Sequence, residues 1–320
     1  MTGLVMKGSR NVFSVKLLPS SVNLSENETA ARLFYECRLK GKVLKCDEDF
    51  YNPLAPGDLI SFEEDALHSG KGMITSLADR RNCFTRYNRK GQLPQILAAN
   101  VDSIVCVVTP AAPPFRPRFA DRVLVQAEAA HIPAVIVVNK CDLGLNAEIE
   151  DRLADFARIG YTIFYVSAMT GDGLDSVRKA LADKLVVFIG QSGVGKSSLV
   201  NALVPDAMLK IGALNEKYNR GNHTTVQAGL LEYETHDGIL RLIDTPGVRQ
   251  FVPCGVRAEE IVFCMPEFAP YVFKCGFGYS CSHRGEKDCA VKTAVDQGII
   301  HHDRYESYQR LYEELHDIEV

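Results

Sequence analysis

The chain lacks the features that would place it in or across a membrane. No apolar run is long enough to span a bilayer, because the longest, such as residues 185–189, are only strand-sized. The opening residues MTGLVMKGSR contain no apolar segment of the kind found in secretory signals. With no export signal, the 10 cysteines are expected to be thiols or metal ligands rather than disulfides. We therefore expect a cytoplasmic protein without a membrane partner.

Neither sign of charge is in large excess. The chain has 36 Lys and Arg residues against 40 Asp and Glu, for a formal net charge of -4. Any contact with RNA must therefore come from local patches rather than from a global attraction. The sequence also has no tryptophan, which excludes no class of protein. A chain of 320 residues with 46% apolar residues can bury a sizeable core and is expected to form two or three domains.

Residues 1–80 are expected to form a small β-domain. Short β-like runs at residues 11–15, 33–39 and 59–62 are separated by turn signals. Several short strands in so few residues favour an OB-type β-barrel, a fold used for binding RNA. An unspecified β-domain is the alternative.

Residues 81–252 are expected to form an α/β domain. Continuous apolar runs are typical of strands that helices cover on both faces, and the spacing between these runs leaves room for crossover helices. The expected strands cover residues 101–108, 134–138, 163–166, 185–189 and 239–243. The expected helices cover residues 118–130, 146–159 and 197–203. We therefore predict a mostly parallel sheet.

A phosphate-binding loop follows the strand at residues 185–189. Its residues fit the pattern G-x-x-x-x-G-K-[ST] between a strand and a helix, and from average residue usage about one chain in a hundred of this length has such a pattern by chance. Its backbone N–H groups would face phosphates, Lys196 would contact the β- and γ-phosphates, and the Ser197 hydroxyl would bind Mg²⁺. The loop consists of Gly190, Gln191, Ser192, Gly193, Val194, Gly195, Lys196 and Ser197, with Ser198 next to it.

A base-binding motif lies upstream of that loop, at Asn139, Lys140, Cys141 and Asp142. The Asp142 carboxylate can accept hydrogen bonds from both N–H groups on the edge of guanine, and a buried carboxylate built for two donors would reject adenine. Ser167 and Ala168 follow the next strand and add a backbone turn beside the base. We therefore predict GTP and GDP as ligands, with Asn139 and Lys140 bracing the two loops.

The γ-phosphate and Mg²⁺ are expected to meet residues from two further segments. Asp244 ends a strand, as a metal-binding carboxylate of this class does, and Gly247 can donate its N–H to the γ-phosphate. Thr224 and Thr225 lie between the phosphate loop and Asp244, and we favour Thr225 as the second Mg²⁺ ligand. The predicted magnesium set is therefore Ser197, Thr225 and Asp244. Since small GTPases place the base-binding motif after these elements, the order here is circularly permuted.

Residues 253–320 contain a candidate zinc site. Cys275, Cys281, His283 and Cys289 offer three thiolates and one imidazole, a tetrahedral set suited to structural Zn²⁺. The segment is short and irregular, so a metal would supply folding energy. Cys264 is the alternative ligand to Cys275, and free structural thiols are the alternative to zinc. A final helix with Tyr305, Tyr308, Leu311, Tyr312 and Leu315 on one face is expected to pack against this region.

Over its whole length the chain resembles the RsgA (YjeQ/YloQ) family of bacterial GTPases that act in maturation of the small ribosomal subunit. The resemblance is carried by the phosphate loop, by residues 220–225 and by the Cys-His cluster. It implies a multi-domain α/β fold: an N-terminal OB-type β-barrel, a circularly permuted P-loop GTPase domain and a C-terminal zinc-binding α-rich domain. Asn222 and Val226 depart from the usual basic residue and Thr, and Cys275 and Cys281 are one residue further apart than is usual.

The resemblance also implies a function. We expect a GTPase that binds the 30S ribosomal subunit and its 16S rRNA, hydrolyses GTP with ribosome stimulation and acts as a late assembly checkpoint. It would be a cytoplasmic monomer that does not bind DNA. The rivals are an RNA-binding zinc protein that uses GTP only as a regulatory ligand, and a GTPase for assembly of the large subunit.

Two more segments have a predicted role. Val248 stands where small GTPases commonly carry a glutamine that orients water, so another group must do so. The resemblance points to His223, and a histidine that contacts only solvent or RNA is the alternative.

A basic and aromatic stretch is expected either to contact RNA or to be a solvated linker. It comprises Arg80, Arg81, Phe84, Arg86, Tyr87, Arg89 and Lys90.

Overall fold

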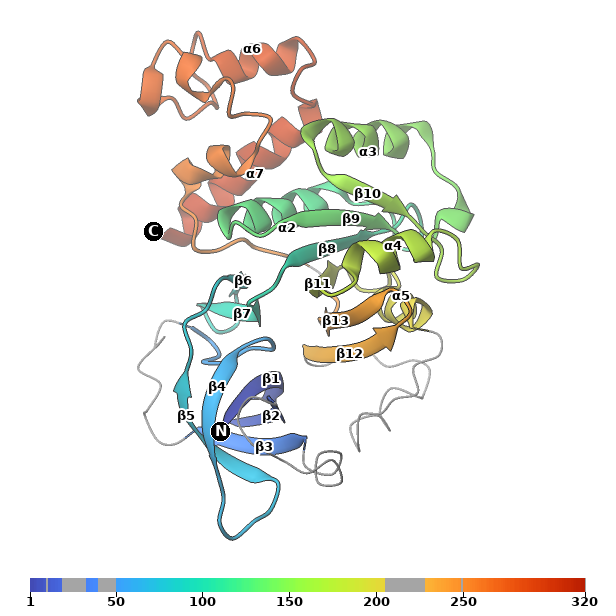
Figure 1. The fold of residues 1–320 in the computed structure, drawn as a ribbon. Helices are drawn as coiled ribbons and strands as arrows, with labels where there is room; N and C mark the ends of the chain where they lie inside the picture. The colour runs from blue at the N-terminus through green and yellow to red at the C-terminus, as the bar shows by residue number, and fades with distance from the viewer. Residues whose placement is uncertain (10, 19–32, 40–49, 205–227, 249, 320) are drawn as a thin grey trace.

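The structure is a computed structural model that describes residues 1–9, 11–18, 33–39, 50–204, 228–248 and 250–319 (Figure 1). Three units follow one another through the molecule. The barrel lies at one end, the central sheet with its helices lies in the middle, and the C-terminal elements lie beyond the helices on the far side (Figure 1). The predicted residues His223, Thr224 and Thr225 lie outside the described residues.

The described part of the N-terminal region forms a closed five-stranded barrel. Its strands are β1 (Thr2–Ser9), β2 (Val12–Leu17), β3 (Phe34–Leu39), β4 (Leu59–Glu64) and β5 (Lys71–Leu77). The order is β1-β2-β3-β5-β4, and β4 pairs back onto β1 and closes the barrel. Only β3 and β5 pair in parallel. Alternate residues such as Phe13, Val15 and Phe62 fill the interior. The predicted OB-type barrel is confirmed.

A hairpin of β6 (Cys83–Asn88) and β7 (Leu93–Ala99), which the sequence patterns did not predict, connects the barrel to the central sheet. The junction is close-packed. Gly57 has a φ of +94°, and a Cβ there would lie 2.1 Å from the carbonyl oxygen of Ala99. Next to it, the fully buried Asp58 accepts hydrogen bonds from Arg80 at 2.7 and 2.9 Å.

This packing corrects the interpretation of the basic and aromatic stretch as one RNA-binding surface. Arg80 is bonded to the buried Asp58. Phe84 is fully buried, and its ring stacks on that of Phe251 with 5.6 Å between the ring centroids. Alternate residues of a hairpin face opposite sides, so the stretch cannot present all its side chains to one ligand. Arg81 and Arg89 remain exposed, paired with Asp102 and Glu314.

The central sheet has the order β10-β9-β8-β11-β13-β12. All neighbours are parallel except β12 and β13. The strands are β8 (Ser103–Val108), β9 (Ala134–Val138), β10 (Thr162–Tyr165), β11 (Leu185–Gly190), β12 (Gly229–Thr235) and β13 (Gly238–Asp244). The mostly parallel sheet and its five predicted strands are confirmed; β12 was not predicted.

Helices cover both faces of this sheet. They are α2 (Pro117–Ala129), α3 (Ala147–Ile159), α4 (Leu174–Leu181) and α5 (Lys196–Leu203). Along β8, Ile104 and Cys106 pack with α2 and α3 residues, whereas Val105 and Val107 pack with α4 and α5 residues. Every residue of β8 is buried because its two faces meet different helix pairs. The carboxyl ends of β8, β9, β11 and β13 therefore open towards one edge, where the site lies.

The C-terminal region is irregular and then helical. It contains the 3₁₀ helices η4 (Ala258–Cys264), η5 (Val272–Lys274) and η6 (Gly278–Ser280), followed by α6 (Ala290–Asp296) and α7 (His302–Glu319). Helix α7 buries Tyr305, Tyr308, Leu311 and Leu315 against η4 and α2, as the spacing predicted.

The barrel is joined to the central sheet through strand pairing. Strand β1 pairs antiparallel with the edge strand β12 at Lys7 and Gly229, so that a single sheet of eleven strands runs through the described residues. Glu232 of β12 also forms ion pairs with Lys16 of β2 and with Arg241.

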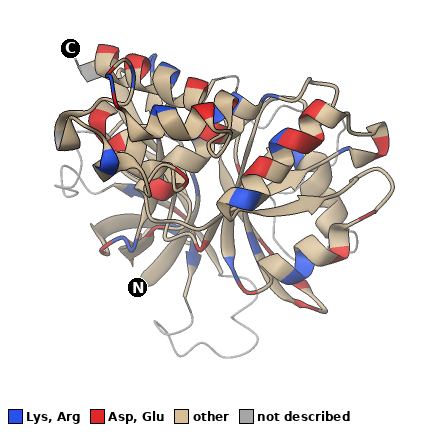
Figure 2. Ribbon diagram, turned by 90° about the horizontal axis from the view of Figure 1, so that it is seen from above, with Lys and Arg blue, Asp and Glu red and all other residues tan. Residues whose placement is uncertain are grey.

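Figure 2 shows acidic and basic residues interspersed along the helices in this view. This distribution matches the small net charge. Within the described ranges, no helix is both long and apolar enough to cross a membrane.

Candidate nucleotide site and metal cluster

The phosphate loop joins β11 to α5 in a conformation that requires glycine. Gly193 and Gly195 have φ values of +85° and +88°, in the left-handed region. A Cβ at Gly195 would lie 2.5 Å from the side-chain nitrogen of Asn139, and one at Gly190 would lie 2.6 Å from the carbonyl oxygen of Val107. The loop therefore has both the left-handed turns and the close approaches that the motif predicts.

Lys196 lies folded into this loop. Its Nζ donates hydrogen bonds to the carbonyl oxygens of Gly190 at 2.8 Å and Gln191 at 3.2 Å, and the residue is buried. Burial lowers the pKa of Lys196, while the nearby Asp244 opposes that shift. An ammonium held only by carbonyl oxygens has a strong electrostatic reason to bind an anion, because phosphate oxygens would offset its desolvation.

Asn139 connects the two nucleotide loops. It is 1% exposed; its Nδ2 donates to the carbonyl oxygen of Val194 at 2.9 Å, and its Oδ1 accepts from the N–H of Ala168 at 3.1 Å. Lys140 donates to the carbonyl oxygens of Gly193, at 2.8 Å, and Ala112. These contacts bring the phosphate loop, the base-binding motif and the turn after β10 together at one edge of the sheet.

Of the predicted base-binding residues, Asp142 is exposed at this edge, whereas Asn139 and Ser167 are buried. Asp142 lies in the 3₁₀ helix η2 (Cys141–Leu143) and is exposed, rather than buried as the sequence suggested. The backbone N–H of Cys141 donates to the carbonyl oxygen of Val166, and its thiol donates to the carbonyl oxygen of Val138. These two hydrogen bonds fix the turn. The buried Ser167 accepts hydrogen bonds from the N–H groups of Met169 and Thr170.

The residues predicted to bind Mg²⁺ fit such an ion as far as they are described. The Ser197 hydroxyl lies 3.5 Å from the carboxylate of Asp244, which is 1% exposed. A hydroxyl and a carboxylate oxygen side by side are hard ligands of the type that Mg²⁺ takes together with phosphate oxygens. Gly247 lies directly over the loop, since a Cβ there would be 2.8 Å from the Cα of Ser192. Val248 donates its N–H to the carbonyl oxygen of Gly190 at 3.2 Å.

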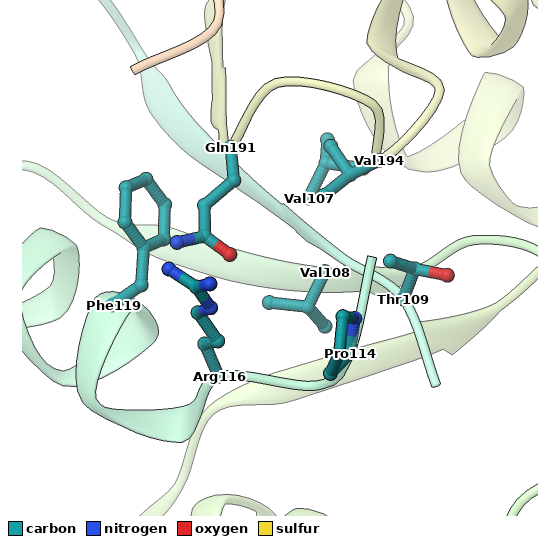
Figure 3. Close-up of a pocket in the computed structure, with 8 residues that line it drawn as sticks. All are labelled: Val107, Val108, Thr109, Pro114, Arg116, Phe119, Gln191 and Val194. Atoms are coloured by element: carbon teal, nitrogen blue, oxygen red, sulfur yellow. The ribbon is translucent and has the colours of Figure 1, made fainter. Parts of the chain in front are cut away.

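Sequence reasoning missed the loop between β8 and α2. Together with Gln191 and Val194 of the phosphate loop, it lines a small pocket, in which the side chain of Arg116 lies beside that of Gln191 (Figure 3). The loop also holds Lys140 through the Ala112 carbonyl oxygen. Any residue type offers a carbonyl oxygen, so no motif signals this contact.

The segment after Gly247 passes between the units. Phe251 is fully buried, stacks on Phe84 and meets Phe119 edge to face at 6.4 Å. Arg122 of α2 donates to the carbonyl oxygen of Phe251 at 3.2 Å and also pairs with Glu314 of α7. The segment after Gly247 thus runs over α2 towards the C-terminal region.

Cys275, Cys281, His283 and Cys289 form one buried cluster, with their ligand atoms within 4.8 Å of one another. The Sγ atoms of Cys275 and Cys289 are 3.9 Å apart, and they lie 3.3 and 3.6 Å from Nδ1 of His283. Around a tetrahedral zinc ion, bonds of about 2.3 Å to sulfur and about 2.0 Å to nitrogen give S–S and S–N spacings of about 3.8 and 3.5 Å. The four residues therefore fit Zn²⁺. The longer Cys275–Cys281 spacing is accommodated, and Cys264 is not part of the cluster.

Burial shifts the pKa values of Cys281, His283 and Cys289. Burial raises the pKa of the Cys281 thiol to about 12 and raises that of Cys289, while it lowers the pKa of His283. Three thiols and an imidazole buried this close together have little reason to cluster, whereas a divalent cation would stabilise the thiolates.

The comparisons with known proteins agree with this architecture. A family profile described as RsgA GTPase matches residues 77–252. The small ribosomal subunit biogenesis GTPase RsgA of Borrelia recurrentis is 36% identical over 311 residues, which cover 97% of this chain and 93% of that protein. The protein of that name from Chlorobaculum parvum is 38% identical over 82% of this chain and 86% of its own.

Two solved structures are similar over nearly their whole length. The crystal structure of YjeQ from Thermotoga maritima has a TM-score of 0.69 and 28% identity and covers 98% of both chains. YloQ, described as a circularly permuted GTPase, has a TM-score of 0.66 and 27% identity and covers 99% of this chain and 95% of its own. The predicted resemblance, permuted fold and enzyme class are thereby confirmed: this chain belongs to the RsgA family of circularly permuted GTPases, which are hydrolases.

Proposed function

We propose that this GTPase binds the 30S ribosomal subunit and acts as a late maturation checkpoint, hydrolysing GTP to GDP and phosphate with ribosome stimulation. The observation that carries the nucleotide-binding part of the proposal is the junction at Asn139, which ties the phosphate loop to the base-binding motif at one edge of the sheet. The small ribosomal subunit is proposed as the partner because the relatives are named small ribosomal subunit biogenesis GTPases.

In this proposal each part of the site has one task. Asp142 accepts the two N–H groups of guanine, with Ala168 and Ser167 beside the base. The backbone N–H groups from Gly190 to Ser198 and the Lys196 ammonium bind the phosphates. Ser197, Asp244 and Thr225 would hold Mg²⁺, which neutralises charge on the β- and γ-phosphates when bound, and Gly247 would donate its N–H to the γ-phosphate.

The attacking water needs a group that Val248 does not supply. Val248 has an apolar side chain that is 5% exposed, so it can neither donate to nor accept from water. We assign that task to His223. A neutral imidazole can accept a hydrogen bond from the attacking water, and the pKa of histidine ordinarily lies near the working pH. Because His223, Thr224 and Thr225 lie outside the described residues, this assignment rests on the sequence and the family.

The chain would work as three domains in the cytoplasm, as a monomer. Residues 1–80 would bind 16S rRNA through the barrel, residues 81–252 would bind and hydrolyse GTP, and residues 253–320 would be held by one structural zinc ion. The OB-type barrel supports the first assignment because this fold binds single-stranded nucleic acid on an open sheet face.

The test combines binding and turnover. The protein is incubated with purified 30S or 50S particles in the presence of GTP, GDP or a non-hydrolysable GTP analogue, and sedimentation measures the bound fraction. Single-turnover hydrolysis is then measured with and without each particle. We expect tighter 30S binding with the GTP analogue than with GDP, and faster hydrolysis only with 30S. Preference for 50S would indicate a large-subunit factor, and binding without turnover would indicate a regulatory GTP site.

A further inference from the structure

The loop that carries two of the four cluster residues is held by one carboxylate. Glu286 lies between His283 and Cys289 in the sequence, outside the cluster itself. Its two oxygens accept four hydrogen bonds: from the Ser282 N–H at 2.7 Å, the Ser282 hydroxyl at 2.6 Å, and the N–H groups of Arg284 and Gly285 at 3.0 Å each. Although burial opposes ionisation, these hydrogen bonds lower the pKa of Glu286 to about 2, so the group is a carboxylate at neutral pH.

The carbonyl side of the same loop is held by α7. The hydroxyl of Tyr308 donates to the carbonyl oxygen of Ser282 at 2.7 Å, and that of Tyr305 donates to the carbonyl oxygen of His283 at 2.8 Å. His283 has a φ of +56°, a left-handed conformation that is unfavourable for a residue with a side chain. The surrounding hydrogen bonds therefore hold His283 in a conformation that it would not adopt by itself.

That conformation directs the imidazole into the cluster. Nδ1 of His283 faces the sulfurs of Cys275 and Cys289, and the residue is 2% exposed. We propose that Glu286 is a positioning residue for the metal site, because its carboxylate fixes the backbone of residues 282–285 so that Cys281 and His283 present their ligand atoms together. This inference rests on the zinc assignment above.

A carboxylate is suited to this task, whereas its amide is not. Glutamine would keep the size of the side chain but offers only one oxygen, and its NH₂ group would face N–H groups that need acceptors. Removing a partner that orients a metal ligand typically lowers metal affinity about 10- to 100-fold.

The experiment compares E286Q with E313Q in the full chain. Glu313 is the matched control because it accepts a hydrogen bond from the Arg284 side chain at 2.6 Å in the same region, with a side chain that is 61% exposed. The rate of zinc release to a chromogenic chelator is measured for the native protein and both variants. We expect release from E286Q to be about 10- to 100-fold faster and release from E313Q to be unchanged.

A second readout separates positioning from general stability. In the cobalt-substituted proteins, the ligand-field absorption reports the geometry of the ligand set. We expect E286Q to shift and weaken these bands, E286D to give an intermediate spectrum and release rate, and E313Q to match the native protein.

Each outcome decides one point. Native release and native bands in E286Q overturn the role of Glu286 while leaving the zinc assignment intact. A native chain purified without chelator that contains no zinc overturns the assignment itself. If E286Q does not fold, E286D decides, and native release from that variant overturns the inference.

Discussion

Arg304 of α7 and Asp121 of α2 are both fully buried and form an ion pair with an N–O distance of 2.9 Å. Asp121 also accepts hydrogen bonds from Arg152 at 2.7 Å and from the hydroxyl of Ser307. Arg304 in turn pairs with Glu267. The Asp121 carboxylate thus joins the C-terminal helix α7 to α2, the helix that follows β8.

We predict that Asp121→Asn strongly destabilises the protein. The substitution keeps the shape but leaves two buried guanidinium groups without their shared charge, which typically costs about 3–5 kcal/mol. Urea unfolding followed by far-UV circular dichroism and tyrosine fluorescence measures the effect, since the chain has no tryptophan. Glu306→Gln, which removes an exposed partner of Arg118 and Arg310, is the control and should cost at most about 1 kcal/mol. Equal losses in the two variants would contradict the prediction.

Asn139→Ala should weaken nucleotide binding indirectly, because the Asn139 side chain bonds to the two nucleotide loops. The change leaves the Val194 carbonyl oxygen and the Ala168 N–H without their partner, so the two loops lose their common support. The cost of the orphaned groups, about 1–3 kcal/mol, predicts about tenfold to hundredfold weaker GDP binding in a fluorescent-nucleotide titration. Cys141→Ser, which keeps a donor for the Val138 carbonyl oxygen, should bind GDP nearly as the native protein does.

Asp142→Asn should remove the preference for guanine. An amide presents a donor where the base also presents donors, and GTP binding should weaken by several kcal/mol. Competition of GTP and ATP against labelled GDP measures the selectivity. Equal competition by the two nucleotides in the native protein would show that residues 139–142 do not bind the base.

Removal of zinc should unfold the C-terminal region selectively. Chelation or Cys289→Ser would take away the cation that stabilises three buried thiolates, and the segment of residues 275–289 contains only the three-residue η6 as regular structure of its own. We expect loss of structure after about residue 250 with nucleotide affinity nearly intact, measured by hydrogen exchange and GDP titration in parallel. Full protection of residues 258–296 after metal removal would argue against a structural ion.

His223→Ala should separate binding from catalysis. We expect GTP affinity within a few-fold of native but loss of most of the 30S-stimulated turnover, because the ribosome would order residues 220–225 and bring the imidazole to the water. Stopped-flow binding and single-turnover hydrolysis, each with and without 30S, measure the two effects. Full stimulated turnover in the variant would assign the catalytic group to rRNA or to another side chain.

The buried parallel strands were predictable because both of their faces are covered, which makes residues 134–138 and 185–189 continuous apolar runs. Strand β12 was not, because it lies next to the barrel and mixes Glu232 and Glu234 with apolar residues. Helix α4 was also not predicted, although its eight residues are amphipathic and bury Leu174, Val177 and Leu181. The β6–β7 hairpin was missed because its charged residues suggested a solvated surface.

The candidate site was predictable where side-chain chemistry defines it. The glycines, Lys196 and the Cys-His set have few substitutes, so their spacing alone identifies them. Contacts through backbone groups, such as Lys140 with Ala112, leave no trace in residue types. Glu286 was equally hidden, because a glutamate in a charged loop looks like a solvated residue until its four donors are seen.

The pairing of β1 with β12 has a consequence for any shortened form of this protein. In the intact chain, the outer edge of β12 meets the barrel at Lys7 and Gly229, and Glu232 is neutralised by Lys16. A fragment that begins after residue 80 would lose this pairing at Gly229 and would leave that end of the edge open to solvent and to other molecules. Such an edge is a template for intermolecular strand addition, so fragments without the barrel should self-associate. The barrel thus covers the Gly229 end of the β12 edge against strand pairing with other copies of the chain.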